Sequence, residues 1–145
     1  MTALVPPYYE ETYIQEQYIE TCVQIGEEYA ICPELLMAMI ERESRGDASA
    51  DNGGGCKGLC QISEKWHEDR MERLGVTDIF DPEDNIRLCA DYLCELGAEY
   101  EDIVLVLMKY HGESDAEEKA EQGILSEYAE WILERSEELE RAHGK

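Results

Sequence analysis

Two glutamates that lie two positions apart, Glu41 and Glu43, fall on opposite faces of a predicted helix. The helix has the sequence PELLMAMIERES and begins at Pro33, because proline is favoured at the first helical position. At about 100° per residue, Glu43 shares a face with Leu36 and Ile40, whereas Glu41 lies on the polar side. We therefore expect Glu41 to be solvated and Glu43 to be desolvated. A desolvated carboxylate is a candidate general acid.

The end of the same helix also acts on Glu43. Gly46 predicts that the helix ends just after Ser44. The negative end of the helix macrodipole disfavours a carboxylate there. Both effects raise the pKa of Glu43, which suits proton donation near neutral pH. An ion pair with Arg45 or Lys57 is the structural alternative, since ion pairs also perturb pKa values.

A second motif follows Glu43 at a defined distance. From Glu43 to Ile62 the chain reads ESRGDASADNGGGCKGLCQI. A Glu-Ser pair at a helix end, a polar loop and then Gly-Leu-x-Gln resembles the signature of the soluble lytic transglycosylase family, lysozyme-like enzymes that cut peptidoglycan. Here Gly58-Leu59-Cys60-Gln61 stands at the family's usual separation, with cysteine in place of methionine. The resemblance implies an all-α, lysozyme-like fold, as in goose-type lysozyme.

Apolar spacing and helix-capping signals predict the elements around this motif. Helices are expected at 10–30, 33–44, 65–74, 82–96, 103–110 and 126–141. Helix 82–96 is capped by Asp81 and apolar nearly all round, so it should be the buried centre. Trp66 and Met71 are expected to pack inward.

The N-terminal helix 10–30 is an addition to the family pattern. We interpret it as a packing helix whose tyrosines lie in the core, with sugar stacking by these and by Tyr8 and Tyr9 as the alternative. A length of 145 residues suits one domain. We assign residues 1–9 to an N-terminal tail and 10–145 to a single lytic transglycosylase domain, with the resemblance covering about 29–139.

The resemblance also implies a set of substrate-binding residues, some of which depart from the family pattern. Tyr110 matches a tyrosine whose hydroxyl reaches the catalytic glutamate, and His111 replaces the asparagine that follows it. Asn52 stands where some members carry a serine that contacts substrate. The full set is Ser44, Asn52, Gln61, Tyr110, His111 and Tyr128. For His111 a structural or exposed role stays open, as does a shift of the pH optimum.

The implied reaction uses one carboxylate twice. Glu43 protonates the oxygen between N-acetylmuramic acid (MurNAc) and N-acetylglucosamine (GlcNAc), then deprotonates the muramyl C6 hydroxyl. That hydroxyl closes on C1 and leaves a 1,6-anhydroMurNAc end without water. One alternative is a goose-type lysozyme-like hydrolase (muramidase), which would also need Asp47 or Asp51. Another is a non-catalytic cell-wall-binding or assembly module.

Composition limits the partners. The chain has 35 Asp and Glu against 12 Lys and Arg, and its net charge of −23 repels nucleic acid. No stretch approaches the roughly 18 apolar residues of a membrane span, and the start lacks the features of a secretory signal. We expect a monomer that acts on peptidoglycan glycan strands outside the cytoplasm, in the wall, secreted, or with a phage or transfer apparatus. The charge favours solubility, with salt adaptation or a cationic partner as alternatives.

Six cysteines raise the questions of metals and disulfides. They are Cys22, Cys32, Cys56, Cys60, Cys89 and Cys94. The short spacings suggest zinc, but Cys89 and Cys94 lie about 140° apart on one helix, which argues against a shared metal. No metal or cofactor is therefore expected, and Cys60 and Cys89 are assigned to the core. A disulfide between distant cysteines, or from Cys22 to Cys32, is the expectation.

Overall fold

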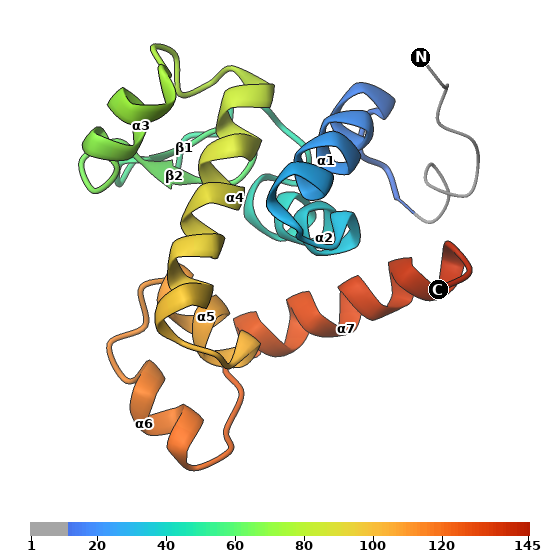
Figure 1. Ribbon diagram of the computed structural model, residues 1–145, viewed down its shortest axis with the longest axis vertical. Coiled ribbons are helices and arrows are strands. Elements are labelled where there is room, and N and C mark those ends of the chain that lie inside the picture. The colour runs from blue at the N-terminus through green and yellow to red at the C-terminus, as the bar shows by residue number, and fades with distance from the viewer. Residues whose placement is uncertain (1–11) are drawn as a thin grey trace.

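The computed structural model describes residues 12–145, which form seven helices and two short strands. The all-α fold prediction is therefore confirmed. The longest helix, α4 (Pro82–Glu99), stands at the centre, with α1 and α2 on one side and α3 with the two strands on the other (Figure 1). Among the described helices, none is both long enough and apolar enough to span a membrane.

Two consecutive helices, α1 (Glu16–Tyr29) and α2 (Pro33–Ser44), pack on each other and on α4. The predicted start of α1 at residue 10, like Tyr8 and Tyr9, lies outside the described residues. Within them the helix begins at Glu16. Tyr18, Cys22 and Ile25 of α1 are buried in the core, as the apolar spacing predicts. The interpretation of α1 as a packing helix is confirmed.

Local signals explain the central helix α4. Its N-cap is Asp81, whose carboxylate accepts a hydrogen bond from the Asp84 backbone N–H at 3.0 Å, and Pro82 follows at the first helical position. Apolar side chains on both sides of the helix are buried: Ile86, Leu88, Cys89, Ala90 and Leu93. The prediction of a buried central helix is confirmed.

The segment between α2 and α4 holds features that the sequence did not predict. Strands β1 (Cys56–Lys57) and β2 (Ile62–Ser63) form an antiparallel hairpin, and two residues are too few to show a strand period. Helix α3 (Glu68–Leu74) begins later than expected. Trp66 therefore lies in the turn before it and is 78% exposed, so its predicted inward packing is wrong. Met71 packs against the core as expected.

Three helices complete the fold. They are α5 (Ile103–Tyr110), α6 (Ala116–Glu121) and α7 (Glu127–Ala142). Helix α6 was not predicted, because its six residues AEEKAE carry no apolar stripe. Helix α7 begins as predicted, with Ser126 Oγ accepting a hydrogen bond from the Ala129 N–H at 3.2 Å.

Helix α7 lies along α2, and this pairing corrects one expectation about Glu41. The carboxylate was expected to be solvated, but its side chain is 4% exposed. Arg135 of α7 donates to it from Nε at 2.8 Å, and the Thr12 hydroxyl donates at 2.8 Å. The error arises because Arg135 follows Glu41 by 94 positions, beyond the reach of helical periodicity.

The cysteine expectations are partly confirmed. Cys60 and Cys89 are fully buried in the core, as predicted. All six cysteines are free thiols, so the expectation of a disulfide, including one from Cys22 to Cys32, is wrong in this structure.

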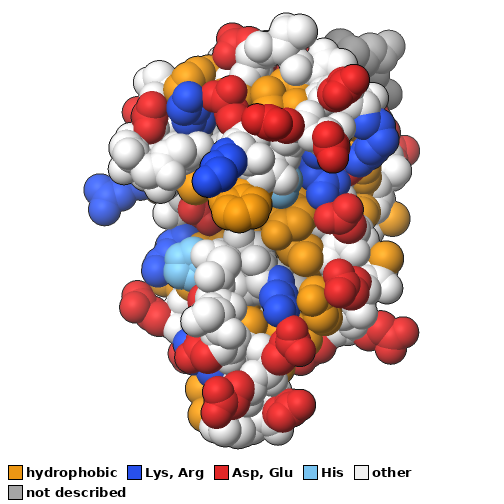
Figure 2. Space-filling view, turned by 90° about the vertical axis from the view of Figure 1, so that its left-hand side faces the viewer, with side chains coloured by type: hydrophobic (Ala, Val, Ile, Leu, Met, Phe, Trp, Pro, Cys, Tyr) orange, Lys and Arg blue, Asp and Glu red, His pale blue; other side chains and the backbone are white. Residues whose placement is uncertain are grey.

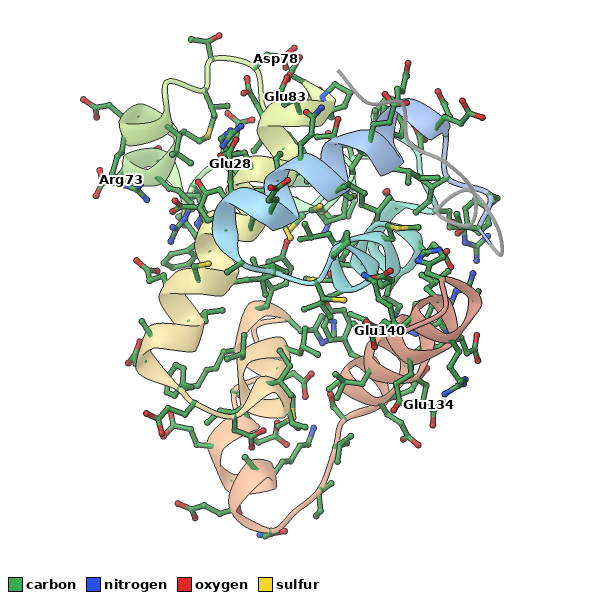
Figure 3. All side chains as sticks on the ribbon, turned by 45° about the vertical axis from the view of Figure 1, so that its right-hand side comes forward. Glu28, Arg73, Asp78, Glu83, Glu134 and Glu140 are labelled. Carbon is green, nitrogen blue, oxygen red and sulfur yellow. The ribbon has the colours of Figure 1, made fainter. Side chains whose placement is uncertain are left out.

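On the face shown in Figure 2, acidic side chains are spread over the surface with Lys and Arg between them. Some of these charges pair across helices. Arg87 of α4 pairs across helices with Glu28 of α1 at 2.5 Å, and it lies 3.8 Å from Glu83 within α4. Figure 3 labels the two glutamates on their helices. Such exposed pairs contribute little to stability, so the fold depends mainly on its buried core.

Candidate active site

Glu43 lies in the last turn of α2, where α2 meets the first turn of α7. Its carboxylate oxygen Oε2 accepts a hydrogen bond from the Tyr128 hydroxyl at 2.5 Å. Tyr128 is the second residue of α7 and its side chain is buried. The contact joins residues 85 positions apart, so the packing of α7 on α2 creates the site.

The pKa of Glu43 is raised, as the sequence predicts. Burial is the largest cause, and it is opposed by the Tyr128 hydrogen bond and by the positive charges of His111 and Arg42. Arg42 does not form a close ion pair with Glu43. Its guanidinium lies over the Tyr128 ring at 5.7 Å and pairs with Glu127 at 3.7 Å. The alternative of an ion pair with Arg45 or Lys57 is not what the structure shows, since Lys57 pairs with Glu64 at 2.7 Å.

A cavity of about 280 Å³ opens beside Glu43. Its lining includes Ser44, Asp51, Asn52 and Gln61, which brings three predicted binding residues to the catalytic candidate. The Ser44 hydroxyl is engaged within the helix end, donating to Ile40 O at 3.1 Å and accepting from the Gly46 N–H at 3.2 Å. Ser44 thus closes the helix end beside Glu43.

Asn52 and the two loop aspartates have local partners. Asn52 Oδ1 accepts from the N–H groups of Gly54 and Cys56, at 2.7 and 3.0 Å. Asp47 Oδ1 accepts from the N–H and hydroxyl of Ser49, and Asp51 Oδ1 accepts from the Gly53 N–H at 2.9 Å. Of the two aspartates, Asp51 alone lines the cavity of Glu43.

A buried asparagine of α4 positions the Gly-Leu-Cys-Gln segment. Asn85 Nδ2 donates to Lys57 O at 3.0 Å and to Ile79 O at 2.8 Å, while its Oδ1 accepts from the Cys60 N–H at 2.7 Å. Gly58 has a φ of +81°, and a Cβ there would meet the Asn85 amide at 2.3 Å. The family glycine is therefore required by both its conformation and this close approach.

Gln61 follows in a left-handed conformation with a φ of 54°, which is uncommon for a residue with a side chain. Its Nε2 donates to Ala50 O at 3.1 Å and to Gly58 O at 3.0 Å. These bonds tie the loop after α2 to the hairpin. The predicted polar residue Gln61 thus lies beside Glu43, held by the backbone on both sides.

On its other side Gln61 lines a larger groove of about 480 Å³. The groove is bordered by Trp66, Arg70, Tyr92, Tyr110 and His111, among others. Because Gln61 borders both spaces, the groove and the Glu43 cavity adjoin at this residue. The groove therefore combines the exposed indole of Trp66 with polar side chains.

The two predicted tyrosines exchange their expected roles. Tyr110 was expected to hold Glu43, but its hydroxyl donates to Cys60 O at 2.8 Å. Tyr128, matched only loosely to the family, supplies the hydroxyl on Glu43 instead. Tyr110 therefore supports the backbone next to Gln61 and borders the groove, and the assignment of its hydroxyl to Glu43 is wrong.

His111 connects Tyr128 to an acidic residue that sequence reasoning missed. Its ring stacks on that of Tyr128, with centroids 3.9 Å apart and planes inclined by 6°. Its Nδ1 lies 3.0 Å from Glu113 Oε2. Among 35 acids, no local signal in the sequence distinguishes Glu113. Arg70 and Trp66 of the groove were missed for a related reason, since neither belongs to the Glu-Ser or Gly-Leu-x-Gln motif.

One cluster outside this site contains metal-ligating groups. Ligand atoms of Cys32, Glu34 and Glu140 lie within 4.8 Å of one another. Glu34 already accepts from Cys32 Sγ at 2.9 Å and from Lys145 Nζ at 2.8 Å, and it lies 2.5 Å from His143 Nδ1. Protein groups thus neutralise this carboxylate, and no metal is needed to account for the cluster.

Comparison with known proteins identifies the family. The family model described as the transglycosylase SLT domain matches residues 20–128. A transglycosylase of Enterobacteria phage PRD1 is 32% identical over 96 residues, which cover 66% of this chain and 35% of the phage protein. Membrane-bound lytic murein transglycosylase F of Desulfosudis oleivorans is 37% identical over 70 residues, or 48% of this chain and 14% of that protein.

A solved structure supports the fold. An inactive mutant of the lytic transglycosylase Slt from Pseudomonas aeruginosa superposes with a TM-score of 0.63 at 18% identity, covering 86% of this chain and 22% of that one. The chain therefore spans about a third or less of the length of these relatives.

Proposed function

Because the chain belongs to the transglycosylase SLT domain family, we propose that it is a peptidoglycan lytic transglycosylase that cleaves the MurNAc–GlcNAc β-1,4 bond. The observation that carries this proposal is Glu43 itself. It is a partly buried carboxylate with a raised pKa, it has the Tyr128 hydroxyl as its hydrogen-bond donor, and it borders a cavity that adjoins a groove.

The raised pKa suits the first step of the reaction. Glu43 gives its proton to the glycosidic oxygen, which leaves with the GlcNAc unit as the bond to MurNAc C1 breaks. The carboxylate that remains is stabilised by the Tyr128 hydrogen bond and by the positive charge of Arg42. The same groups that lower the pKa of Glu43 therefore also stabilise its ionised form.

In the second step the Glu43 carboxylate takes the proton of the muramyl C6 hydroxyl. The C6 oxygen closes on C1, and the product carries a 1,6-anhydroMurNAc end, while the proton from the C6 hydroxyl restores the acid form of Glu43. No water enters, and atoms balance without a second carboxylate. Because the nucleophile belongs to the same sugar, proximity lowers the barrier.

The groove gives the glycan strand a place to lie. Trp66 provides an exposed aromatic face, while Gln61 borders both the groove and the cavity of Glu43. We place the sugars on one side of the cleaved bond in the groove, with Trp66 stacked on a sugar ring. Peptidoglycan strands are thus the proposed partner, and the proposed place of action is outside the cytoplasm, where this polymer lies.

Mass spectrometry of fragments released from purified peptidoglycan tests the proposal. The wild-type protein should release muropeptides that are lighter by one water and carry anhydroMurNAc ends. Glu43→Gln should release none, because an amide cannot donate and then accept the proton, while strand binding persists. Unaltered release by Glu43→Gln would exclude Glu43 as the acid.

The same experiment separates the alternatives. A muramidase would give reducing ends, and its release would be lost in Asp51→Asn, since Asp51 lines the Glu43 cavity. A non-catalytic binding module would release nothing from walls of several types although the protein is folded and binds them.

A further inference from the structure

Glu113 lies at the meeting point of three helices, and its side chain is 12% exposed. Its Oε2 lies 3.0 Å from His111 Nδ1 at the end of α5 and accepts from the Ser126 hydroxyl at 2.8 Å at the start of α7. Its Oε1 accepts from Lys119 Nζ of α6 at 3.2 Å. Glu113 thus joins side chains from the end of α5, from α6 and from the start of α7.

Two partners of Glu113, Ser126 and His111, both help to position the Tyr128 side chain. Ser126 is the N-cap of α7, so the bond from its hydroxyl to Glu113 fixes the helix start two residues before Tyr128. His111 presents the ring on which Tyr128 stacks, 3.9 Å between centroids. One carboxylate therefore sets both the backbone and the ring environment of the residue that donates to Glu43.

The ionised state of Glu113 fits this role. Burial acts to raise the pKa of its carboxyl, but the hydrogen bonds from His111, Ser126 and Lys119 together lower it below its ordinary value. Glu113 is therefore an anion near neutral pH and accepts from all three donors at once.

We propose that Glu113 is a positioning residue, which holds His111 and Ser126 and thereby fixes the Tyr128 hydroxyl on Glu43. It touches neither the reacting sugar nor Glu43, and it acts through Tyr128. The inference rests on the proposed function, because its readout is the cleavage that Glu43 performs.

The effect on pH dependence follows from the groups that face Glu43. Their side chains come from α2, β1, the Gly-Leu-Cys-Gln segment, the C-terminal end of α5 and α7: Arg42, Cys56, Cys60, Tyr110, His111 and Tyr128. Of these, Tyr128 donates the hydrogen bond that lowers the pKa of Glu43 most. When Tyr128 is displaced, the pKa of Glu43 rises, and the alkaline limb of the rate profile, which reports the acid, moves to higher pH.

The test measures kcat and KM on soluble glycan strands for Glu113→Gln, with Asp115→Asn as the matched control. Asp115 pairs with the same Lys119 at 3.3 Å but contacts neither His111 nor Ser126. We expect Glu113→Gln to lower kcat about tenfold with KM within about twofold, and to move the alkaline limb upward. Asp115→Asn should match the wild type in kcat, in KM and in the position of the alkaline limb.

A double-mutant cycle decides whether Glu113 acts through Tyr128. Tyr128→Phe should lower kcat more than Glu113→Gln does, and adding Glu113→Gln to it should cost less than about twofold further. Independent, multiplying losses would overturn the proposal, and so would an active wild type with an unaffected Glu113→Gln. An inactive wild type would instead overturn the proposed function.

Two partial variants cover the case in which Glu113→Gln does not fold. His111→Phe keeps a stacking ring but loses the bond to Glu113. Ser126→Ala loses the hydrogen bond between the start of α7 and Glu113. Each should lower kcat by a few fold and shift the alkaline limb in the same direction. Wild-type kinetics in both would contradict the proposal.

Discussion

The two ends of helix α2 shift the pKa of a glutamate in opposite directions. Glu34, near the N-terminal end, is fully buried against the end of α7, and Glu43, near the C-terminal end, is partly buried against the start of α7. Burial acts to raise the pKa of both, yet hydrogen bonds from Cys32, Lys145 and His143 lower that of Glu34 to about 2. The pKa of Glu43 is raised, since among the described residues burial outweighs the hydrogen bond from Tyr128 and the charges of His111 and Arg42.

The comparison shows that partners, and not burial alone, decide whether a buried carboxylate acts as an acid. The helix itself adds to the difference, because its N-terminal end favours an anion and its C-terminal end disfavours one. Glu34 is thus an anion that holds α7 against α2, whereas the raised pKa of Glu43 favours the protonated form that a general acid needs. The antiparallel pairing of these two helices creates both environments at once.

Replacing Glu34, at the N-terminal end of α2, should have the largest effect on stability. Glu34→Gln leaves Lys145 and the buried His143 without their carboxylate, and we expect a loss of about 3–5 kcal/mol in the free energy of unfolding. Chemical denaturation measures it. Glu134→Gln, an exposed position on the same α7 (Figure 3), is the control and should change stability little. Equal stability of the two variants would show that Glu34 does not hold α7 against α2.

The pH dependence of stability should carry the signature of Glu34. Its folded pKa of about 2 lies below the ordinary value of 4.5, so its stabilisation is complete above pH 4.5 and is lost as the pH falls toward 2. The loss should be on the order of 3 kcal/mol. Unfolding curves of wild type and Glu34→Gln should therefore converge on acidification. Parallel curves over that window would show that the Glu34 pKa is not lowered.

Tyr128→Phe should reduce activity about 10- to 100-fold while the protein remains folded. The hydrogen bond to the ionised Glu43 is lost, which corresponds to about 1.4–2.8 kcal/mol of barrier. The pKa of Glu43 should rise further, so the alkaline limb of the rate profile moves up. Tyr110→Phe is the contrast, since its hydroxyl bonds Cys60 O, and it should leave that limb in place. A shift in Tyr110→Phe and none in Tyr128→Phe would restore the expectation from sequence.

The smallest expected effect is a gain in stability, and it follows from replacing Glu43. Because the folded pKa of Glu43 is raised, this residue contributes stability below its unfolded pKa, and the contribution is lost as the pH rises through its folded pKa. Above that folded pKa an ionised Glu43 costs stability, so Glu43→Gln should raise the melting temperature slightly there, while abolishing cleavage at every pH. A lower melting temperature would mean that the carboxylate is stabilised as an anion.

Local patterns in the sequence predicted most of the elements. Pro33, Asp81 and Ser126 each mark a helix start that the structure confirms, because caps depend on neighbours within a few residues. The apolar spacing of α1 and α4 likewise identifies their buried faces. Helix α6 and the hairpin lack such patterns, so they were not predicted from the sequence.

The site was predicted where one segment contains it and missed where segments meet. Glu43 and Gln61 lie within one motif, and both border the same cavity. The Glu43 donor was assigned to Tyr110 instead of Tyr128, and Glu41 was expected in solvent, because both contacts come from the packing of α7 on α2. Sequence periodicity gives the face of a helix but not what covers it.

The most direct test is a carbon-13 NMR titration of the glutamate side-chain carboxyls, with Glu43→Gln and Glu34→Gln used to assign the two signals. We predict that Glu43 titrates above 4.5 and that Glu34 stays ionised well below it, approaching 2. If Glu43 titrates at or below 4.5, the contrast between the two ends of α2 fails, and with it the role of Glu43 as a general acid near neutral pH.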